Sequence, residues 1–88
     1  MDAYILIVDD DRLLREVLAD FLKANGYGVD TAENASLALA KFSVGKYKLA
    51  IIDQSMPGMS GIDLMIELLR QDPDLQCLIM TGFPTIDL

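Results

Sequence analysis

The sequence indicates an α/β domain in which helices cover both faces of a parallel β-sheet. Short apolar runs rich in β-branched residues occupy 4–8 and 49–52, which is typical of strands that are buried on both faces. Between such runs, apolar residues recur at three- and four-residue intervals, as they do in amphipathic helices. Strand and helix alternate three times, which favours βαβ units with right-handed crossovers.

The first half of the chain predicts two strand–helix pairs. The first strand is expected at 4–8, and a helix follows whose apolar residues share one stripe: Leu13, Leu14, Val17, Leu18, Phe21 and Leu22. Asp10 or Asp11 can cap this helix, and Gly26 can end it. The second strand is expected at 27–32. The second helix begins after Asn34 as its N-cap and has these residues on one face: Ala35, Ala38, Leu39 and Phe42.

The second half predicts a third strand, a turn-rich loop, a third helix and a fourth strand. The third strand covers 49–52 and ends at Asp53, and the loop at 56–61 contains Gly58 and Gly61, which are expected to serve turn geometry. The third helix stops before Pro73 and is amphipathic, with its apolar pattern carried by Ile62, Met65, Leu68 and Leu69. The fourth strand is expected at 75–80.

Composition limits the classes of function. The 88 residues make one domain of 9.7 kDa, with 52% hydrophobic and 24% charged residues, as in globular proteins. A net charge of -7 disfavours nucleic acid and anionic membranes as partners and favours cations as ligands. The chain contains no histidine, which excludes catalysis by histidine and every metal site that contains histidine. The single cysteine, Cys77, cannot form an internal disulfide, which together with the absence of a leader-like segment favours the cytoplasm.

Four polar residues follow three of the expected strands. Asp9 and Asp10 follow the first strand, Asp53 ends the third, and Thr81 follows the fourth. In open parallel sheets, ligands bind outside the carboxyl ends of the strands, where the strand order reverses. We therefore expect three carboxylates and a hydroxyl to converge on one rim.

The chain resembles the receiver domains of bacterial two-component response regulators. The resemblance is carried by VDDD at 8–11, IIDQSMPGMSG at 51–61 and MTG at 80–82, in the family's order along the chain. It implies a flavodoxin-like fold, a three-layer α/β/α arrangement with strand order 2-1-3-4, and phosphorylation of Asp53 by a histidine kinase or phosphotransfer protein. It also implies Mg²⁺ bound directly by Asp10 and Asp53, by Asp9 mostly through water, and by the backbone carbonyl of Ser55. Thr81 would be the hydroxyl that senses the phosphoryl group.

Each of these residues also has a structural interpretation. The acids at 9–11 could cap the following helix, Asp53 could be an ordinary turn residue, and Thr81 an ordinary β-branched residue of a strand. The lysines at 23, 41, 46 and 48 are interpreted as solvated surface. The convergence of acids from separate strands favours the functional interpretation.

The family pattern continues beyond the fourth strand with a helix, a strand and a further helix, and the chain ends at Leu88. No lysine here occupies the place of the family's lysine at the end of the next strand. The chain, incomplete by this pattern, leaves the edge of the fourth strand unpaired and one sheet face covered by the first helix alone. Together with the apolar residues Phe83, Ile86 and Leu88, this favours either a longer native chain or self-association through that edge.

The sequence therefore predicts a phosphoacceptor signalling module that is not an enzyme. One alternative is a receiver-like interaction or oligomerisation module that is not phosphorylated, which the missing lysine favours. Another is a flavin-binding or small hydrolytic α/β enzyme. The absence of histidine and of a phosphate-binding Gly-rich loop after the first strand disfavours that class. No direct nucleic-acid or membrane partner is expected.

Overall fold

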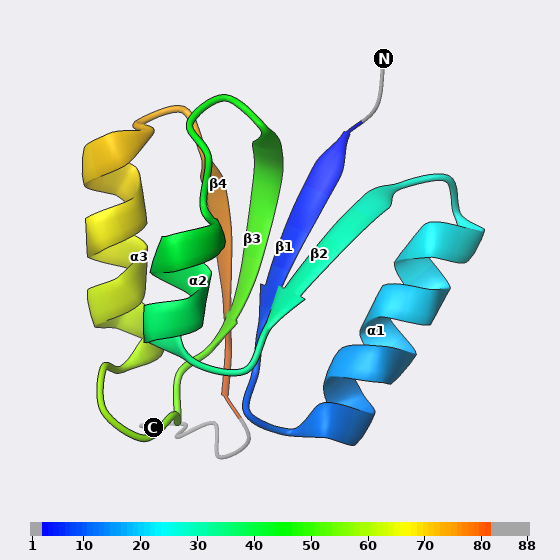
Figure 1. The fold of residues 1–88 in the computed structure, drawn as a ribbon, viewed down its shortest axis with the longest axis horizontal. Coiled ribbons are helices and arrows are strands. Elements are labelled where there is room, and N and C mark those ends of the chain that lie inside the picture. The colour runs from blue at the N-terminus through cyan, green and yellow to red at the C-terminus, as the bar shows by residue number, and fades with distance from the viewer. Residues whose placement is uncertain (1–2, 82–88) are drawn as a thin grey trace, which may run out of the picture.

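The computed structural model describes residues 3–81 and shows a parallel four-stranded sheet with helices on both faces (Figure 1). The elements in chain order are β1 Tyr4–Val8, α1 Arg12–Ala24, β2 Gly28–Ala32, α2 Ala35–Lys41, β3 Tyr47–Asp53, α3 Gly61–Gln71 and β4 Gln76–Met80. The strand order is β2-β1-β3-β4, and all three strand pairings are parallel. The predicted class and strand order are confirmed. Within residues 3–81, no helix has the length and apolar character that crossing a membrane requires.

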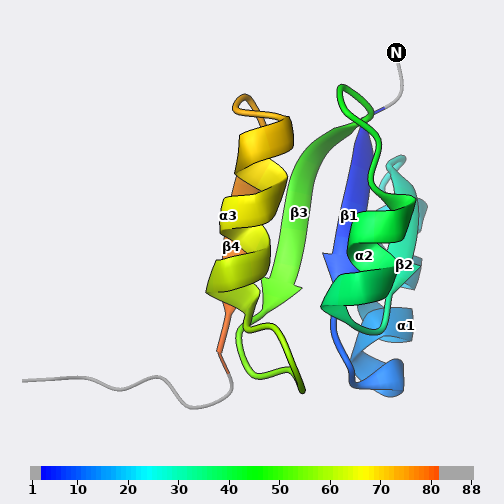
Figure 2. The same cartoon turned by 60° about the vertical axis from the view of Figure 1, so that its left-hand side comes forward.

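Three layers are evident when the molecule is turned (Figure 2). Helices α2 and α3 cover one face of the sheet, and α1 lies on the other, against β1 and β2. The core is accordingly split by the sheet into two clusters. On the α2–α3 side it includes Leu6, Val8, Ala50, Ile52, Leu64 and Leu68. On the α1 side it consists of Ile5, Ile7, Ala19 and Ile51. Consecutive residues of β1 and β3 thus enter different clusters, which is why these strands are apolar at every position.

Strand β3 starts earlier than the apolar run predicts. Its first residues are Tyr47, which is buried, and Lys48, which is exposed, and Tyr47 pairs with Tyr4 of β1. The exposed lysine interrupts the apolar pattern, so the pattern does not predict this part of the strand. Smaller shifts occur at β2 and β4, which each begin one residue later than predicted, and α2 ends one residue before Phe42.

Each of the three helices within residues 3–81 begins with a side-chain N-cap. The carboxylate of Asp11 accepts hydrogen bonds from the N–H groups of Leu13 and Leu14, so Asp11, and not Asp10, is the N-cap of α1. Asn34 caps α2 as predicted, and Ser60 caps α3. Because Asp11 performs the capping, the carboxylate of Asp10 is left for another role.

The apolar stripe of α1 is wider than the surface it packs on. Leu18 and Leu22 pack against the core, as the stripe predicts. Four other members are exposed: Leu13, Leu14, Val17 and Phe21. The single-stripe prediction is therefore only partly correct. The reason is that α1 sits over β1 and β2, and no described element packs beside it over β3 and β4.

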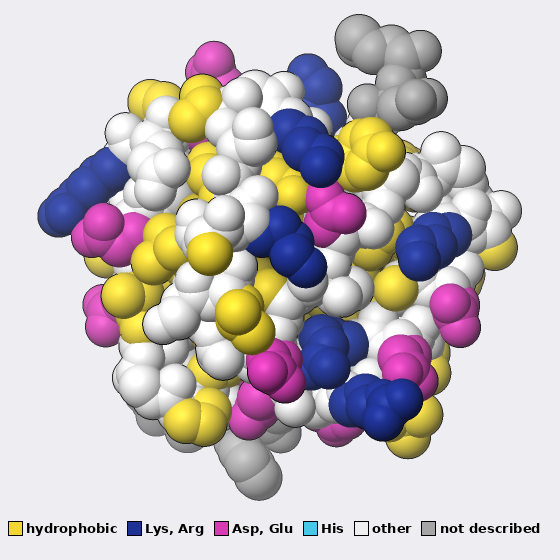
Figure 3. Space-filling model, in the orientation of Figure 1, with side chains coloured by type: hydrophobic (Ala, Val, Ile, Leu, Met, Phe, Trp, Pro, Cys, Tyr) yellow, Lys and Arg dark blue, Asp and Glu magenta, His cyan; other side chains and the backbone are white. Residues whose placement is uncertain are grey.

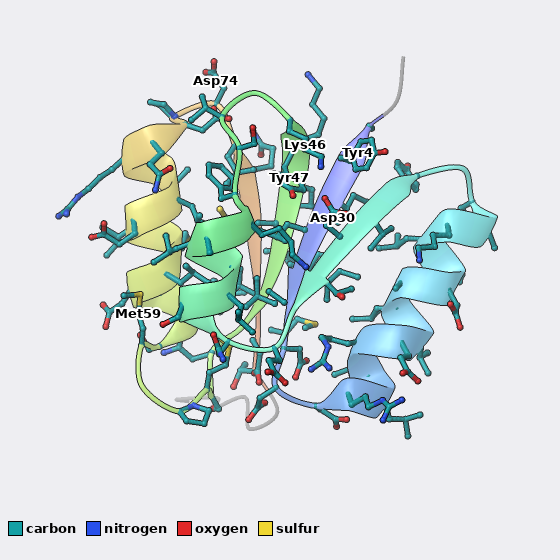
Figure 4. The ribbon with its side chains drawn as sticks, in the orientation of Figure 1. Tyr4, Asp30, Lys46, Tyr47, Met59 and Asp74 are labelled. Atoms are coloured by element: carbon teal, nitrogen blue, oxygen red, sulfur yellow. The ribbon has the colours of Figure 1, made fainter. Side chains whose placement is uncertain are left out.

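Lys46 and Lys41 are exposed, in agreement with their interpretation as surface, but both also make contacts within the fold. Lys46 Nζ lies 3.0 Å from Asp30 Oδ2 and over the rings of Tyr4 and Tyr47, at 4.9 and 5.4 Å from their centroids. Tyr47 also donates its hydroxyl to Asp30 (2.7 Å), and Figure 4 shows these four side chains gathered at the amino end of the sheet. Lys41 donates to the backbone carbonyl of Thr31.

Candidate functional site

The parallel topology brings the predicted polar residues to one rim. Val8 of β1 pairs with Ile52 of β3, so Asp9, the next residue, stands beside Asp53. Asp53 in turn pairs with Met80, the last residue of β4, and Thr81 follows it. The order reverses between β1 and β3, where ligands of such sheets bind. In Figure 1 this rim is the lower end of the sheet, where the arrowheads point.

Three carboxylates converge there. One oxygen each of Asp9, Asp10 and Asp53 lies within 4.8 Å of the other two, although the residues come from two different segments. The same acids line an open hollow of about 430 Å³ together with Ser55 and Thr81. All five residues predicted for the site therefore meet around one space. A helix cap alone does not explain this arrangement, because the cap is made by a different aspartate, Asp11.

Asp9 is the least accessible of the acids, with 2% of its surface exposed. Burial raises the pKa of its carboxyl, the N–H of Asp11 opposes this shift by donating to Oδ1 (2.9 Å), and the charges of Asp53, Asp10 and Asp11 raise the pKa further. The ionised cluster is therefore strained by mutual repulsion in the absence of a cation.

Asp53 is half-buried at the end of β3, and its Oδ1 accepts a hydrogen bond from the N–H of Ser55 at 3.2 Å. The backbone of the next residue is held by β4, because Gln54 donates its N–H to the carbonyl of Met80 (2.9 Å). The Asp53 carboxylate is therefore carried by a strand end that hydrogen bonds hold in place. Asp53 also lines the hollow.

The loop between β3 and α3 folds back onto the strand end. Gly58 has a φ of +81°, so its expected role in turn geometry is confirmed. Gly61 has a different role: a Cβ there would lie 2.8 Å from the Cα of Gln54 and would collide with the carbonyl of Asp53. Gly61 also donates its N–H to the carbonyl of Gln54, and the side chain of Gln54 accepts from Ile62. Helix α3 therefore begins in direct contact with the strand end that carries Asp53.

One residue of the site was not found by sequence reasoning. Arg15 of α1 donates from Nη1 to the backbone carbonyl of Asp9 at 2.7 Å. An arginine on the polar side of an amphipathic helix is ordinary in sequence, so no pattern distinguishes it. Only the packing of α1 against the turn at 9–11 shows the contact.

The donor set suits a hard divalent cation. The clustered side-chain donors are all carboxylate oxygens, and neither histidine nor sulfur is among them. Mg²⁺ prefers oxygen ligands and is usually held by one or two carboxylates together with water and substrate phosphate. An open hollow beside the carboxylates leaves room for those additional ligands. The residues present therefore fit Mg²⁺.

These observations define a doubly wound α/β domain with an acidic cation-type site at its strand ends. The model of the response regulator receiver domain matches residues 5–88. The chain belongs to this family, and it is a receiver module of the two-component type.

Relatives agree with this assignment. The response regulator protein FleR of Pseudomonas aeruginosa is 37% identical over 87 residues, which is 99% of this chain and 18% of FleR. The two-component response regulator PhoP of the same organism is 42% identical over 89% of this chain and 35% of its own length. The chain thus spans well under half of either curated relative.

A solved structure matches this chain over most of its own length. The response regulator protein TrrA of Thermotoga maritima, in complex with Mg²⁺–BeF, is 41% identical with a TM-score of 0.84, over 92% of this chain and 70% of TrrA. TrrA has also been solved in complex with the histidine kinase ThkA, and there it is 40% identical with a TM-score of 0.84, over 94% of this chain and 72% of that one.

Proposed function

We propose that Asp53 accepts a phosphoryl group and that Asp9, Asp10 and Asp53 hold Mg²⁺ for this reaction. The observation that carries the proposal is the convergence of the three carboxylates, with oxygens within 4.8 Å of one another, around a hollow that Thr81 also lines. Such a cluster repels itself unless a cation is present. The Mg²⁺–BeF complex of the 41% identical TrrA supports this use of the site.

The reaction is an attack of an Asp53 carboxylate oxygen on a phosphorus atom, which breaks the bond between phosphorus and the donor. Bound Mg²⁺ supplies positive charge that offsets the repulsion between the carboxylate and the phosphoryl oxygens. Asp53 is held for the attack by the Ser55 N–H and by the pairing of β3 with β4. We assign direct metal contacts to Asp10, Asp53 and the Ser55 carbonyl, and a contact through water to the more buried Asp9.

Thr81 is the proposed sensor of the phosphoryl group. It follows β4 immediately and lines the same hollow as Asp53. Its hydroxyl can donate to a phosphoryl oxygen, and serine could do the same but valine could not. The donor is proposed to be a histidine kinase or phosphotransfer protein, supported by the complex of TrrA with ThkA. We propose that this module works in the cytoplasm and does not itself bind nucleic acid or turn over an external substrate.

The test is phosphorylation by a small donor. Incubation with acetyl phosphate and Mg²⁺ should give one covalent adduct by intact mass spectrometry, and the adduct should be absent from the Asp53→Asn variant. Asp74→Asn removes the same charge from a residue drawn at the opposite end of the sheet and should leave the adduct unchanged (Figure 4). An unmodified wild type, in a sample that calorimetry shows to bind Mg²⁺, would contradict the phosphoacceptor role and favour a module that only binds partners.

A further inference from the structure

Arg15 differs from the other described arginines in what it binds. Arg12 pairs with Glu16 and Arg70 with Glu67, in ion pairs whose arginine side chains are 83% and 71% exposed. Arg15 is half-buried and points its Nη1 at a backbone oxygen, the carbonyl of Asp9, at 2.7 Å. Among the described residues it has no ion-pair partner within 4.0 Å. Its guanidinium is therefore directed at the turn that carries the acids.

The carbonyl of Asp9 belongs to the peptide group that joins two of the three clustered carboxylates. A peptide group is planar, so fixing its oxygen fixes the rotation of the whole plane about its two Cα atoms. That rotation sets the directions in which the side chains of Asp9 and Asp10 leave the backbone. A bond at this oxygen thus constrains both carboxylates although it touches neither of them.

Two further hydrogen bonds hold the turn, one before and one after this peptide group along the chain. Asp9 donates its N–H to the carbonyl of Ala32 at the end of β2 (3.1 Å), and Asp11 donates its N–H to Asp9 Oδ1 (2.9 Å). No described group other than Arg15 donates to the Asp9 carbonyl. Arg15 therefore completes a set of bonds that fixes the turn from β2, from the loop itself and from α1.

The hydrogen bond from Arg15 opposes the electrostatic repulsion among the three carboxylates. One oxygen each of Asp9, Asp10 and Asp53 lies within 4.8 Å of the other two, so the three charges repel one another, which favours a splayed turn when no cation is bound. A hydrogen bond from a charged guanidinium is stronger than one between neutral groups, and it acts against this splaying. Replacing a residue that orients metal ligands without touching the metal commonly changes metal affinity by about 10- to 100-fold.

We propose that Arg15 is a positioning residue, which holds the peptide between Asp9 and Asp10 so that both carboxylates face a divalent cation before it binds. The proposal rests on the function assigned to the site above. It predicts that loss of the guanidinium weakens Mg²⁺ binding and loosens the turn even without metal.

The test compares Arg15→Met with Arg12→Met in the 88-residue chain. Both substitutions remove one positive charge from the first turns of α1, but only Arg15→Met removes the bond to Asp9. Titration calorimetry should show a Mg²⁺ Kd raised about tenfold in Arg15→Met, and changed less than about twofold in Arg12→Met. Arg15→Lys keeps the positive charge and one donor that can reach the Asp9 carbonyl, so it should give an intermediate Kd. Equal weakening in the two methionine variants, or wild-type affinity in a folded Arg15→Met protein, would overturn the proposal.

A second readout needs no metal. In the presence of EDTA, the amide of Asp11 should exchange its hydrogen several-fold faster in Arg15→Met than in Arg12→Met, because its acceptor is Asp9 Oδ1. If the wild type binds no Mg²⁺, the proposed function fails, and unchanged Asp11 exchange would then also refute the role of Arg15. If Arg15→Met does not fold, Arg15→Gln takes its place in both measurements under the same criteria.

Discussion

Asp9 and Asp30 carry the same side-chain group, and their surroundings shift its pKa in opposite directions. The pKa of Asp9 is raised by burial and by its acidic neighbours. Burial also acts to raise the pKa of Asp30, but hydrogen bonds from Tyr47 and Lys46, with the charges of Lys46 and Lys41, lower it overall. The Asp9 carboxylate is thus surrounded by like charges, whereas the Asp30 carboxylate has a cationic partner, Lys46, within the fold.

Removing one charge from the acidic cluster should stabilise the metal-free protein. We expect Asp53→Asn to raise the free energy of unfolding in EDTA by about 1 kcal/mol at low salt, because it relieves repulsion with Asp9 and Asp10. This corresponds to a melting temperature roughly 4–8 °C higher. Mg²⁺ should stabilise the wild type and no longer this variant. Thermal unfolding followed by circular dichroism measures both effects.

Asp74→Asn is the matched control for this prediction, since it removes a charge at the other end of the sheet. It should leave both the metal-free melting temperature and the response to Mg²⁺ unchanged. A destabilised Asp53→Asn protein that still responds to Mg²⁺ would show that the carboxylate is structural.

The ion pair and hydrogen bond of Asp30 should make stability depend on pH. Its folded pKa lies below the ordinary value of 3.8, so its contribution is fully present above pH 3.8 and is lost as the pH falls through the lower folded pKa. We expect Asp30→Asn to cost about 1 kcal/mol at neutral pH. In urea titrations at decreasing pH, the difference between variant and wild type should shrink below 3.8. Glu67→Gln, which breaks an exposed pair with Arg70, should show less than about 0.5 kcal/mol at any pH.

At the scale of the elements, the start of α3 is decided by a contact and not by helix propensity. Gly61 is the first residue of α3, where alanine would be favoured by about 1 kcal/mol if propensity alone mattered. The absence of a side chain lets α3 approach the strand end at 53–54. The position of the helix therefore depends on a residue that is a poor helix former.

The change in stability of Gly61→Ala has opposite signs for the two effects: helix propensity alone would stabilise the variant, and the backbone contact would destabilise it. The new Cβ would collide with backbone atoms of Asp53 and Gln54, which cannot rotate away as a side chain can. We expect a loss of about 1–3 kcal/mol in denaturant unfolding and weaker Mg²⁺ binding, because the strand end with Asp53 must shift. Ile62→Ala alters the same helical turn at an exposed position and should cost less. A stabilised Gly61→Ala protein would contradict the contact argument.

Considering the whole molecule, the two faces of the sheet are covered unequally. Of the elements within residues 3–81, two helices cover one face, whereas α1 alone lies on the other (Figure 2). Leu78 of β4 pairs with Ile51, a residue of the α1-side cluster, and is 53% exposed. Strand β4 is also the edge of the described sheet. By contrast, the face drawn in Figure 3 intersperses basic, acidic and apolar side chains, with no large patch of one kind.

Among residues 3–81 no strand pairs with the outer edge of β4, and an unpaired apolar edge favours self-association of the 88-residue chain. We expect an average mass above the monomer in size-exclusion chromatography with light scattering at high concentration. Leu78→Lys should shift the chain toward monomer, because an exposed lysine on an edge strand opposes pairing. Ile62→Lys, at an exposed position of α3, should not. A wild type that stays monomeric at every concentration would refute this expectation. The apolar residues Phe83, Ile86 and Leu88 that contribute to it lie outside the described residues.

The sequence alone determined the alternation of strands and helices, the strand order through its resemblance, and the three acids of the site. Each of these is encoded locally, as an apolar period, a cap or a short motif, and parallel strands necessarily end at one edge. Tertiary structure alone decided which aspartate caps α1, that β3 begins at Tyr47, and that much of the α1 stripe is exposed. It also decided the roles of Arg15 and Gly61, because these depend on how closely α1 and α3 approach the strand ends, and no local pattern records that distance.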